Sequence, residues 1–335
     1  MIRFFQRKWN PSCYQGGTDK SHHFEGWYFK ITDKNERHSF AIIPGVIIHP
    51  YEDTSHAFIQ IFDGTNNETF YHQFPIQDFI YKKGSFDIKI NSNSFSKDRL
   101  VLELKSHAFE IYGKLKFTQL TPWPKTLISP GIMGWYTWVP FMECYHGIVS
   151  LNHNLEGTLE LNGDQIDFSD GKGYTEKDWG HSFPEAYIWL QSNHFSTDNV
   201  TLTGSIAIIP WIKRPFLGLI FGLWHQDKLY RFTTYLGAKL IHFEMNECKV
   251  HCVLRQKKYI LQITARRESG GYLRAPALDG MKYQISESLN STLDIQLSCN
   301  NARKQIVIFN DTGRHAGFEM AGNIPRLLEM VQRTK

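Results

Sequence analysis

Apolar and polar residues alternate with a period of two along most of this 335-residue sequence, and this pattern limits the fold more than any other feature. The alternation is clear at positions 86–90, 111–117, 259–263 and 293–297. Successive side chains of a β-strand point to opposite faces, so each stretch predicts a strand with one buried face. Where the alternation continues on both sides of Asn162-Gly163, it predicts a tight β-hairpin.

Helical periodicity is scarce, and residues 324–331 are the best candidate for a helix. Many short strands with frequent turns are typical of barrels and sandwiches. The predicted fold class is therefore all-β, with antiparallel β-barrel or sandwich domains and few short helices. Strand patterns resume at 187–190, soon after a motif at 173–180, which predicts an N-terminal domain of residues 1–182 and a C-terminal domain of residues 183–335.

Composition and motifs argue against several classes of protein. Hydrophobic residues make up 41% and charged residues 21%, which allows a packed core. The net charge is +4, and the 37 basic residues are scattered rather than gathered into the stripe that a nucleic-acid-binding protein shows. The sequence contains no Rossmann glycine fingerprint, P-loop, HExxH motif or GxSxG elbow. The aromatic content of 14% fits either a β-rich core or an aromatic-lined cavity.

The cysteines and the apolar runs predict a cellular location. The five cysteines are odd in number and form no CxxC pair, which favours free thiols and a reducing compartment. Cys248 and Cys252, with His251 between them, lie in a strand-like segment without a second pair of metal ligands. The most apolar stretch, Pro215 to Trp224, is too short to span a bilayer as a helix. We expect a cytoplasmic protein without an obligate protein partner, for which a peripheral membrane contact stays open.

The first candidate for chemistry is Glu25, within the aromatic segment 22–30. A carboxyl group surrounded by aromatic side chains loses its hydration, which would raise the pKa of Glu25 and could keep the group protonated at neutral pH. A surface salt bridge is the alternative. The neighbouring Trp27 is either a core residue or part of a ligand-binding wall.

The second candidate is the pair Glu176 and Asp178 in the segment 173–184. On a strand the two acids share one face and Lys177 lies on the other. Two carboxyl groups held close together raise the pKa of one of them, and a neutral acid beside the indole of Trp179 could protonate an alkene. A structural turn, in which the acids cap backbone N–H groups, is the alternative.

The third candidate is the unusually aromatic segment 131–147, which either lines a pocket or packs between two domains. Its aromatic residues include Trp135, Tyr136, Trp138, Phe141 and Tyr145.

These segments resemble the corresponding motifs of tocopherol cyclases. The matching residues are Phe24 to Phe29 (FEGWYF), Gly173 to Gly180 (GYTEKDWG), Phe183-Pro184 and Leu273 to Pro276 (LRAP). Their order and spacing match from about residue 20 to about residue 320, and FEGWYF together with EK-x-WG is specific.

The resemblance implies a fold and a reaction. The family is related to carotenoid hydratase and AttH-like proteins, which pair two lipocalin-like β-domains. Tocopherol cyclases close a chroman ring on a prenylated hydroquinone and need neither a metal nor a redox cofactor. The implied reaction is protonation of a prenyl double bond, followed by capture of the tertiary cation by a phenol oxygen. We therefore expect an intramolecular lyase, an isomerase, that acts on a hydrophobic prenylquinol-type substrate without cofactors.

Together the motifs and the resemblance predict the site residues. The predicted catalytic residues are Glu176, Asp178, His181 and Glu25. The predicted substrate-binding residues are Trp27, Tyr28, Trp135, Tyr136, Trp138, Tyr174 and Trp179. Plant members of the family have Asn at the position of Asp178 and glycines around His181-Ser182, so the natural substrate stays open. A non-catalytic carrier of a hydrophobic small molecule and a hydratase of a polyene are the alternative functions.

Overall fold

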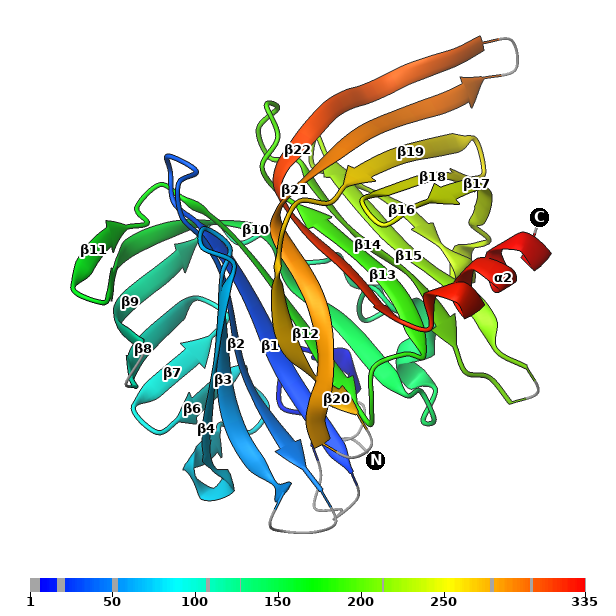
Figure 1. The fold of residues 1–335 in the computed structure, drawn as a ribbon. Coiled ribbons are helices and arrows are strands. Elements are labelled where there is room, and N and C mark those ends of the chain that lie inside the picture. The colour runs from blue at the N-terminus through cyan, green and yellow to red at the C-terminus, as the bar shows by residue number, and fades with distance from the viewer. Residues whose placement is uncertain are drawn as a thin grey trace. The chain divides into compact units, whose positions relative to one another are not determined.

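The computed structural model describes residues 7–16, 22–49, 54–106, 109–126, 128–212, 214–277, 280–301 and 304–334, apart from the side chains of residues 282 and 334. The chain forms two compact units (Figure 1). Unit 1 comprises Met1–Phe183 and Leu273–Gln284, and unit 2 comprises Pro184–Tyr272 and Ile285–Lys335. The first segment of unit 1 ends at Phe183, and residues 273–284 return to unit 1. The division into domains of residues 1–182 and 183–335 stays a prediction.

Unit 1 is built on a twelve-stranded antiparallel sheet with the order β4-β3-β2-β1-β12-β10-β9-β8-β7-β6-β5, in which β11 pairs with β10. Its strands are β1 (His23–Thr32), β2 (Ser39–Ile48), β3 (His56–Asp63), β4 (Glu68–Pro75), β5 (Phe79–Tyr81), β6 (Asp87–Ile90), β7 (Asn93–Ser96), β8 (Arg99–Lys105), β9 (Glu110–Thr118), β10 (Cys144–Leu161), β11 (Asp164–Asp167) and β12 (Lys172–Gly180). Two short 3-10 helices, η2 (Ile76–Asp78) and η3 (Gly134–Trp138), interrupt them.

Unit 2 is built on a ten-stranded antiparallel sheet with the order β16-β15-β14-β13-β22-β21-β19-β18-β17, in which β20 pairs with β21. Its elements are β13 (Ala186–Ser192), β14 (Thr201–Ile209), β15 (Phe216–His225), β16 (Lys228–Thr233), η4 (Thr234–Leu236), β17 (Lys239–Met245), β18 (Lys249–Gln256), β19 (Tyr259–Arg266), β20 (Gly271–Ala277), β21 (Gly280–Asn301), β22 (Lys304–Gly322) and α2 (Ile324–Thr334). Most of β20 and the start of β21 belong to unit 1, and β21 continues into unit 2.

The apolar side chains of the alternating strands pack into a separate hydrophobic core in each unit. In unit 1, Trp27, Phe29 and Ile31 of β1 are fully buried, and Phe29 lies within 6.0 Å of the rings of Phe86, Phe95 and Phe117. Burying each such side chain stabilises the fold by roughly 1.5–3 kcal/mol. The other side of β1 therefore carries Tyr28 and its alternate neighbours, which leaves a second face of the sheet for a site.

The predicted all-β fold class with few helices is confirmed, and so are two of its local features. The turn at Asn162-Gly163 joins β10 to β11, with φ values of 51° and 92° that suit a tight hairpin. The predicted C-terminal helix is α2, which packs Leu327 and Val331 into the core of unit 2. Asn323 caps it by accepting the backbone N–H of Arg326 at 3.1 Å.

The cysteines are free, as expected. Cys252 is buried in the core of unit 2, while Cys248 is exposed. His251, between them on β18, bonds through Nδ1 to the hydroxyl of Thr264 at 2.8 Å. Within the described residues, these three side chains do not form a cluster that could hold a metal ion.

His153 makes the stability of unit 1 sensitive to acid. Its side chain is buried on β10 against Phe117, with ring centroids 4.5 Å apart, and burial lowers its pKa from 6.5 to about 3. The unfolded chain binds this proton near pH 6.5 and the folded chain does not, so stability present above pH 6.5 falls as the pH drops towards 3. We expect His153→Leu to flatten this part of the pH dependence of the free energy of unfolding. Urea denaturation of both proteins between about pH 7 and pH 4 measures it, and two parallel curves would contradict the assignment.

Candidate functional site

Strand β12 lies between β1 and β10, and its alternation divides the GYTEKDWG motif between two faces of the sheet. One face carries Tyr174, Glu176 and Asp178, and the other carries Lys177 and Trp179. The prediction that the two acids share a face opposite Lys177 is confirmed. Figure 1 shows β12 running beside β1 in the sheet of unit 1.

A cluster of four titratable side chains forms on the first face. His146 of β10 lies directly opposite Asp178, and its Nδ1 is 2.9 Å from Oδ1 of Asp178. The other ring nitrogen, Nε2, is 3.7 Å from Oε2 of Glu176. The same Glu176 oxygen accepts a short hydrogen bond from the hydroxyl of Tyr174. We call His146, Glu176 and Asp178, with the hydroxyl of Tyr174, the acid cluster.

The acid cluster is partly open to solvent. The side chain of Glu176 is 6% exposed, whereas those of His146 and Asp178 are 17% and 23% exposed. A small reactant can therefore reach the imidazole and the Asp178 carboxyl group, while Glu176 sits deeper. At these distances the two carboxyl groups and the imidazole can pass a proton among themselves. The arrangement is suited to giving a proton to a bound molecule and taking one back.

Three members of the acid cluster, His146, Glu176 and Asp178, have ligand atoms within 4.8 Å of one another, which is close enough to hold a metal ion. No other such group of His, Cys, Asp and Glu occurs among the described residues. Imidazole nitrogen and carboxylate oxygen are common ligands of divalent metals. Both nitrogens of His146, however, already face carboxylate oxygens, and Tyr174 donates a proton into the cluster. The hydrogen bonds from His146 to Asp178 and from Tyr174 to Glu176 thus already engage these ligand atoms.

On the opposite face, Glu25 and Lys177 form a buried ion pair. Nζ of Lys177 is 2.5 Å from Oε2 of Glu25, and both side chains are 0% exposed. Glu25 also accepts the backbone N–H groups of Gln15, at 2.8 Å and 3.0 Å, and of Gly16, and it contacts Nε2 of His23 at 2.9 Å. A carboxylate with this many donors is held in its charged form.

Of the two interpretations of Glu25, the protonated acid is therefore wrong, and the salt bridge exists but is buried rather than at the surface. Burial by itself raises the pKa of Glu25, but the charge of Lys177 and the hydrogen bond from His23 outweigh it and lower the pKa below 4.5. The aromatic neighbours that suggested desolvation are present, but Lys177, which lies among them, is too far away in the chain to be recognised as a neighbour from the sequence. Glu25 is a charge partner inside the sheet, and it lies on the face away from the acid cluster.

Trp27 and Trp179 surround the ammonium group of Lys177. Its Nζ lies 4.6 Å from the ring centroid of Trp27 and 4.9 Å from that of Trp179. The indole that was expected to stabilise a substrate cation thus faces a protein cation. Trp179 and Trp27 point away from Glu176, whereas Tyr28 lies directly opposite Glu176 across the β1–β12 pairing.

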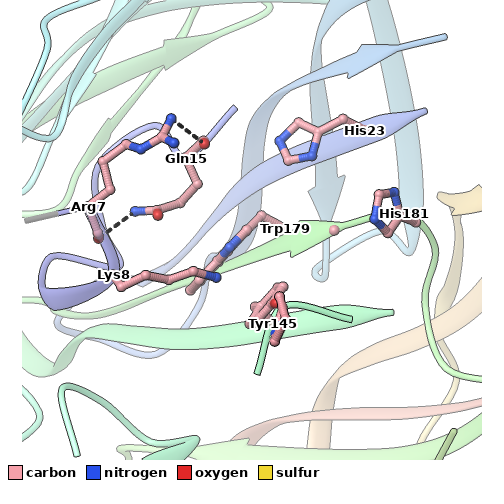
Figure 2. A pocket seen from close by; sticks show the side chains of 9 residues that line it. Arg7, Lys8, Gln15, His23, Tyr145, Trp179 and His181 are labelled. Carbon is pink, nitrogen blue, oxygen red and sulfur yellow. Dashed lines mark hydrogen bonds between the residues drawn. The ribbon is translucent and has the colours of Figure 1, made fainter. Parts of the chain in front are cut away.

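Trp179 and His181 belong to a pocket of about 180 Å³ in unit 1. Its described lining residues are Arg7, Lys8, Gln15, His23, Pro140, Tyr145, Trp179, Gly180 and His181 (Figure 2). His181 is exposed, and its Nδ1 lies 2.7 Å from the backbone oxygen of His22. This pocket, which we call the Trp179 pocket, lies on the other face of β12 from the acid cluster because Asp178 and Trp179 are successive strand residues.

The remaining predicted binding residues lie in η3 and are not among the described residues that line the Trp179 pocket. Trp135 is 44% exposed and its ring centroid is 4.2 Å from that of Tyr136, while Nε1 of Trp138 donates to the backbone oxygen of Ile128 at 3.3 Å. From the same aromatic segment, Tyr145 does line the pocket.

His146 was not among the predicted site residues, although it lies in the aromatic segment 131–147. Nothing in the local sequence distinguishes it from the other histidines. His146 and Asp178 are 32 positions apart and meet only because β10 and β12 pair in this register. The alternation along β10 predicts on which face of the sheet His146 lies, but it does not predict which residue of the adjacent strand lies beside it.

Comparison with known proteins identifies related sequences and a matching family. The family model described as tocopherol cyclase-like matches residues 105–322. A rice protein (Oryza sativa subsp. japonica) named "Probable tocopherol cyclase, chloroplastic" is 26% identical over 206 residues, which cover 56% of this chain and 42% of that protein. A maize protein (Zea mays) named "Tocopherol cyclase, chloroplastic" is 25% identical over 201 residues, which cover 56% of this chain and 41% of that protein. The match thus spans less than half the length of these relatives.

Solved structures agree on the fold. The crystal structure of CghA aligns with a TM-score of 0.53 at 9% identity, over 90% of this chain and 89% of that chain. A Nitrosomonas europaea protein assigned to AttH also aligns with a TM-score of 0.53, at 11% identity, over 92% of this chain and 94% of that chain. In the part of the chain that the structure describes, no helix is long and apolar enough to cross a bilayer.

The family match covers the strand that carries Glu176 and Asp178, the strand that carries His146, and most of unit 2. The resemblance seen in the motifs is confirmed: this chain belongs to the tocopherol cyclase-like family.

Proposed function

We propose that this protein is a cofactor-independent intramolecular cyclase in which the acid cluster protonates a prenyl double bond of a hydrophobic, prenylquinol-type substrate. The observation that carries the proposal is the close contact of His146 with both Glu176 and Asp178, on a strand within the segment that matches the family. Such a group holds a proton at a defined place and accepts it back after the reaction.

The proposed reaction conserves every atom of the substrate. A proton leaves the acid cluster and bonds to the less substituted carbon of the double bond, which leaves a tertiary cation. The phenol oxygen attacks this cation and forms the ring C–O bond. The phenolic proton then passes to the acid cluster, so the enzyme ends the cycle in the state in which it began. The product is an isomer of the substrate, as expected of an intramolecular lyase.

The surroundings of the acid cluster fit such a step. Tyr28 and Tyr174 lie beside Glu176 on the same face of the sheet, and both are almost fully buried. Their rings offer an electron-rich surface near the place where positive charge develops. Because the two reacting groups belong to one molecule, holding the chain folded supplies much of the rate enhancement. Keeping water away from the cation favours ring closure over hydration.

The experiment that tests this function is incubation of the purified protein with a panel of prenylated hydroquinones, followed by mass spectrometry of the products. A cyclase yields a new product of unchanged mass. A product heavier by one water would instead support a hydratase. Tight binding with no new product would support a carrier. The same assay with a strong chelator tests whether the acid cluster works without a metal ion. We expect turnover to be unchanged by the chelator, and loss of turnover would contradict the proposal.

A cytoplasmic location and the absence of nucleic-acid and obligate protein partners stay predictions. The two plant relatives are named as chloroplastic, and they match over less than half of their length. Fractionation of the source cells with an antibody against unit 1 tests the location.

A further inference from the structure

Gly26 lies beside the acid cluster, in the same row of the sheet. It is directly opposite Asp178 across the β1–β12 pairing, and His146 is directly opposite Asp178 across the β10–β12 pairing. Figure 1 shows β1 between β2 and β12. Residues that pair directly in this way share a face of the sheet, so Gly26 leaves bare backbone on the face that carries the acid cluster.

The bare backbone at Gly26 has room above it. Apart from its chain neighbours, Ile43 is the one described residue with an atom within 4 Å of a Cβ built at Gly26, and that contact is 3.7 Å. The φ angle of Gly26 lies outside the left-handed region, so the backbone itself does not require glycine. Gly26 is half-buried, between Phe24 and Tyr28, which are 3% and 7% exposed. Accessible surface therefore remains at Gly26, between two buried aromatic residues.

An aromatic ring limits this space on the side away from the acids. Gly45 of β2 lies opposite Gly26, and Phe58 of β3 lies opposite Gly45. A Cβ built at Gly45 would lie 2.4 Å from Cζ of Phe58, so the Phe58 ring covers Gly45 and points along the row towards Gly26. Neighbouring strands are about 4.8 Å apart, so roughly 10 Å separates the strand of Asp178 from the strand that the ring covers.

The Phe58 ring is held in place by a series of contacts within unit 1. It stacks on the ring of Tyr71, with centroids 5.4 Å apart and an interplanar angle of 19°. The guanidinium carbon of Arg274 lies 4.6 Å from the centroid of the Tyr71 ring. The buried amide of Gln60 accepts the backbone N–H of Arg274 at 2.8 Å and donates to its backbone oxygen at 3.1 Å. Arg274 of the LRAP motif thus supports the position of the ring.

We propose that Gly26 is a specificity-determining position, over which the reacting isoprene unit of the substrate lies, between Asp178 and the ring of Phe58. The inference rests on the proposed function and adds where the double bond binds. A branched five-carbon unit is about as wide as one strand spacing of roughly 4.8 Å. Its double bond then faces the acid cluster, and the tertiary cation that protonation produces faces the aromatic ring of Phe58.

Isothermal titration calorimetry of the full-length protein with isopentylhydroquinone tests the proposal. This compound carries a saturated isoprene unit that cannot be protonated, so its binding is measured without turnover. We expect Gly26→Ala to weaken its binding about tenfold or more, and Gly26→Val to weaken it further, because the added methyl groups occupy the place of the isoprene unit. Hydroquinone without a side chain should bind equally to all three proteins.

Gly131→Ala is the matched control. A Cβ built at Gly131 also has its nearest described neighbour, Cγ of Pro11, at 3.7 Å, and the same Pro11 contacts a Cβ built at Gly147, on the other face of β10 from His146. This variant should bind isopentylhydroquinone as the unaltered protein does. Equal affinity of the unaltered and Gly26→Ala proteins, or no binding to the unaltered protein, would overturn the proposal.

Photolabelling of the unaltered protein covers the case in which the Gly26 variants do not fold. An isopentylhydroquinone with a diazirine on its side chain should label residues 24–28 or Phe58, as read by peptide mass spectrometry, and labelling confined to other residues would overturn the proposal. The proposed cyclase can fail separately. Weaker binding by Gly26→Ala, without ring closure by the unaltered protein, would support the binding position and contradict the cyclase. Ring closure that Gly26→Ala leaves unchanged would contradict the binding position alone.

Discussion

Lys177→Met is expected to lower the free energy of unfolding by about 3–5 kcal/mol, the range for a buried ion pair that loses one partner. Both side chains of the Glu25–Lys177 pair are 0% exposed, so the carboxylate of Glu25 would stay buried without its main counter-charge. Methionine keeps the aliphatic length of lysine between Trp27 and Trp179, so the loss reports the charge rather than a cavity. Urea denaturation followed by tryptophan fluorescence measures the change.

Two further variants make this prediction specific. Lys34→Met removes an ion pair of the same kind, with Asp170, in which both side chains are well exposed, and it is expected to change stability little. Adding Glu25→Gln to Lys177→Met removes the unpaired charge and should restore part of the lost stability. A Lys177→Met protein as stable as the Lys34→Met protein would show that the pair does not hold this part of the sheet together.

Glu176→Gln is expected to lower kcat of the cyclisation by about 10²–10⁴-fold while the protein stays folded. The amide keeps the size of the carboxyl group, and its oxygen can still accept the hydrogen bond from the hydroxyl of Tyr174, but it cannot hold and return the proton that the reaction needs. Single-turnover measurement of product formation gives the rate of the chemical step. Binding of the substrate should change much less than this rate, because the ring and chain contacts remain.

The acid cluster also predicts how variants combine. His146→Gln should lower kcat within the same range, and the triple variant with Asp178→Asn should be about as slow as the slowest single variant, because groups that share a proton act as one unit. The matched control is Glu156→Gln, at an exposed carboxylate paired with Lys116. Near wild-type turnover of the Glu176→Gln variant would show that a group outside the acid cluster donates the proton and that the acid cluster has a structural role only.

The elements of the fold could be read largely from local sequence. A few neighbouring residues determine these features. The examples are the hairpin turn with positive φ values at Asn162 and Gly163 and the helix cap at Asn323. The same local rule placed Glu176 and Asp178 on one face and Lys177 on the other, because alternation along a strand does not depend on the partner strand.

The identity of neighbours across strands could not be read in this way. A protonated Glu25 was one of two interpretations because the local sequence around it is aromatic, and the structure sets Glu25 against Lys177, which is far away in the chain. Trp179 was expected beside the catalytic acids because it follows Asp178 directly in the sequence. Successive residues of a strand point to opposite faces, so Trp179 lies on the face away from the acids.

The sequence alone determined the all-β class, the hairpin, the terminal helix, the family and the face on which each residue of β12 lies. Only the tertiary structure decided that His146 joins Glu176 and Asp178, that Lys177 neutralises Glu25, and that Lys8 lies over the ring of Tyr145. The physical reason is that backbone alternation is a property of one strand, whereas protonation and charge balance depend on atoms a few ångströms away in space. The register of β1, β12 and β10 brings those atoms together.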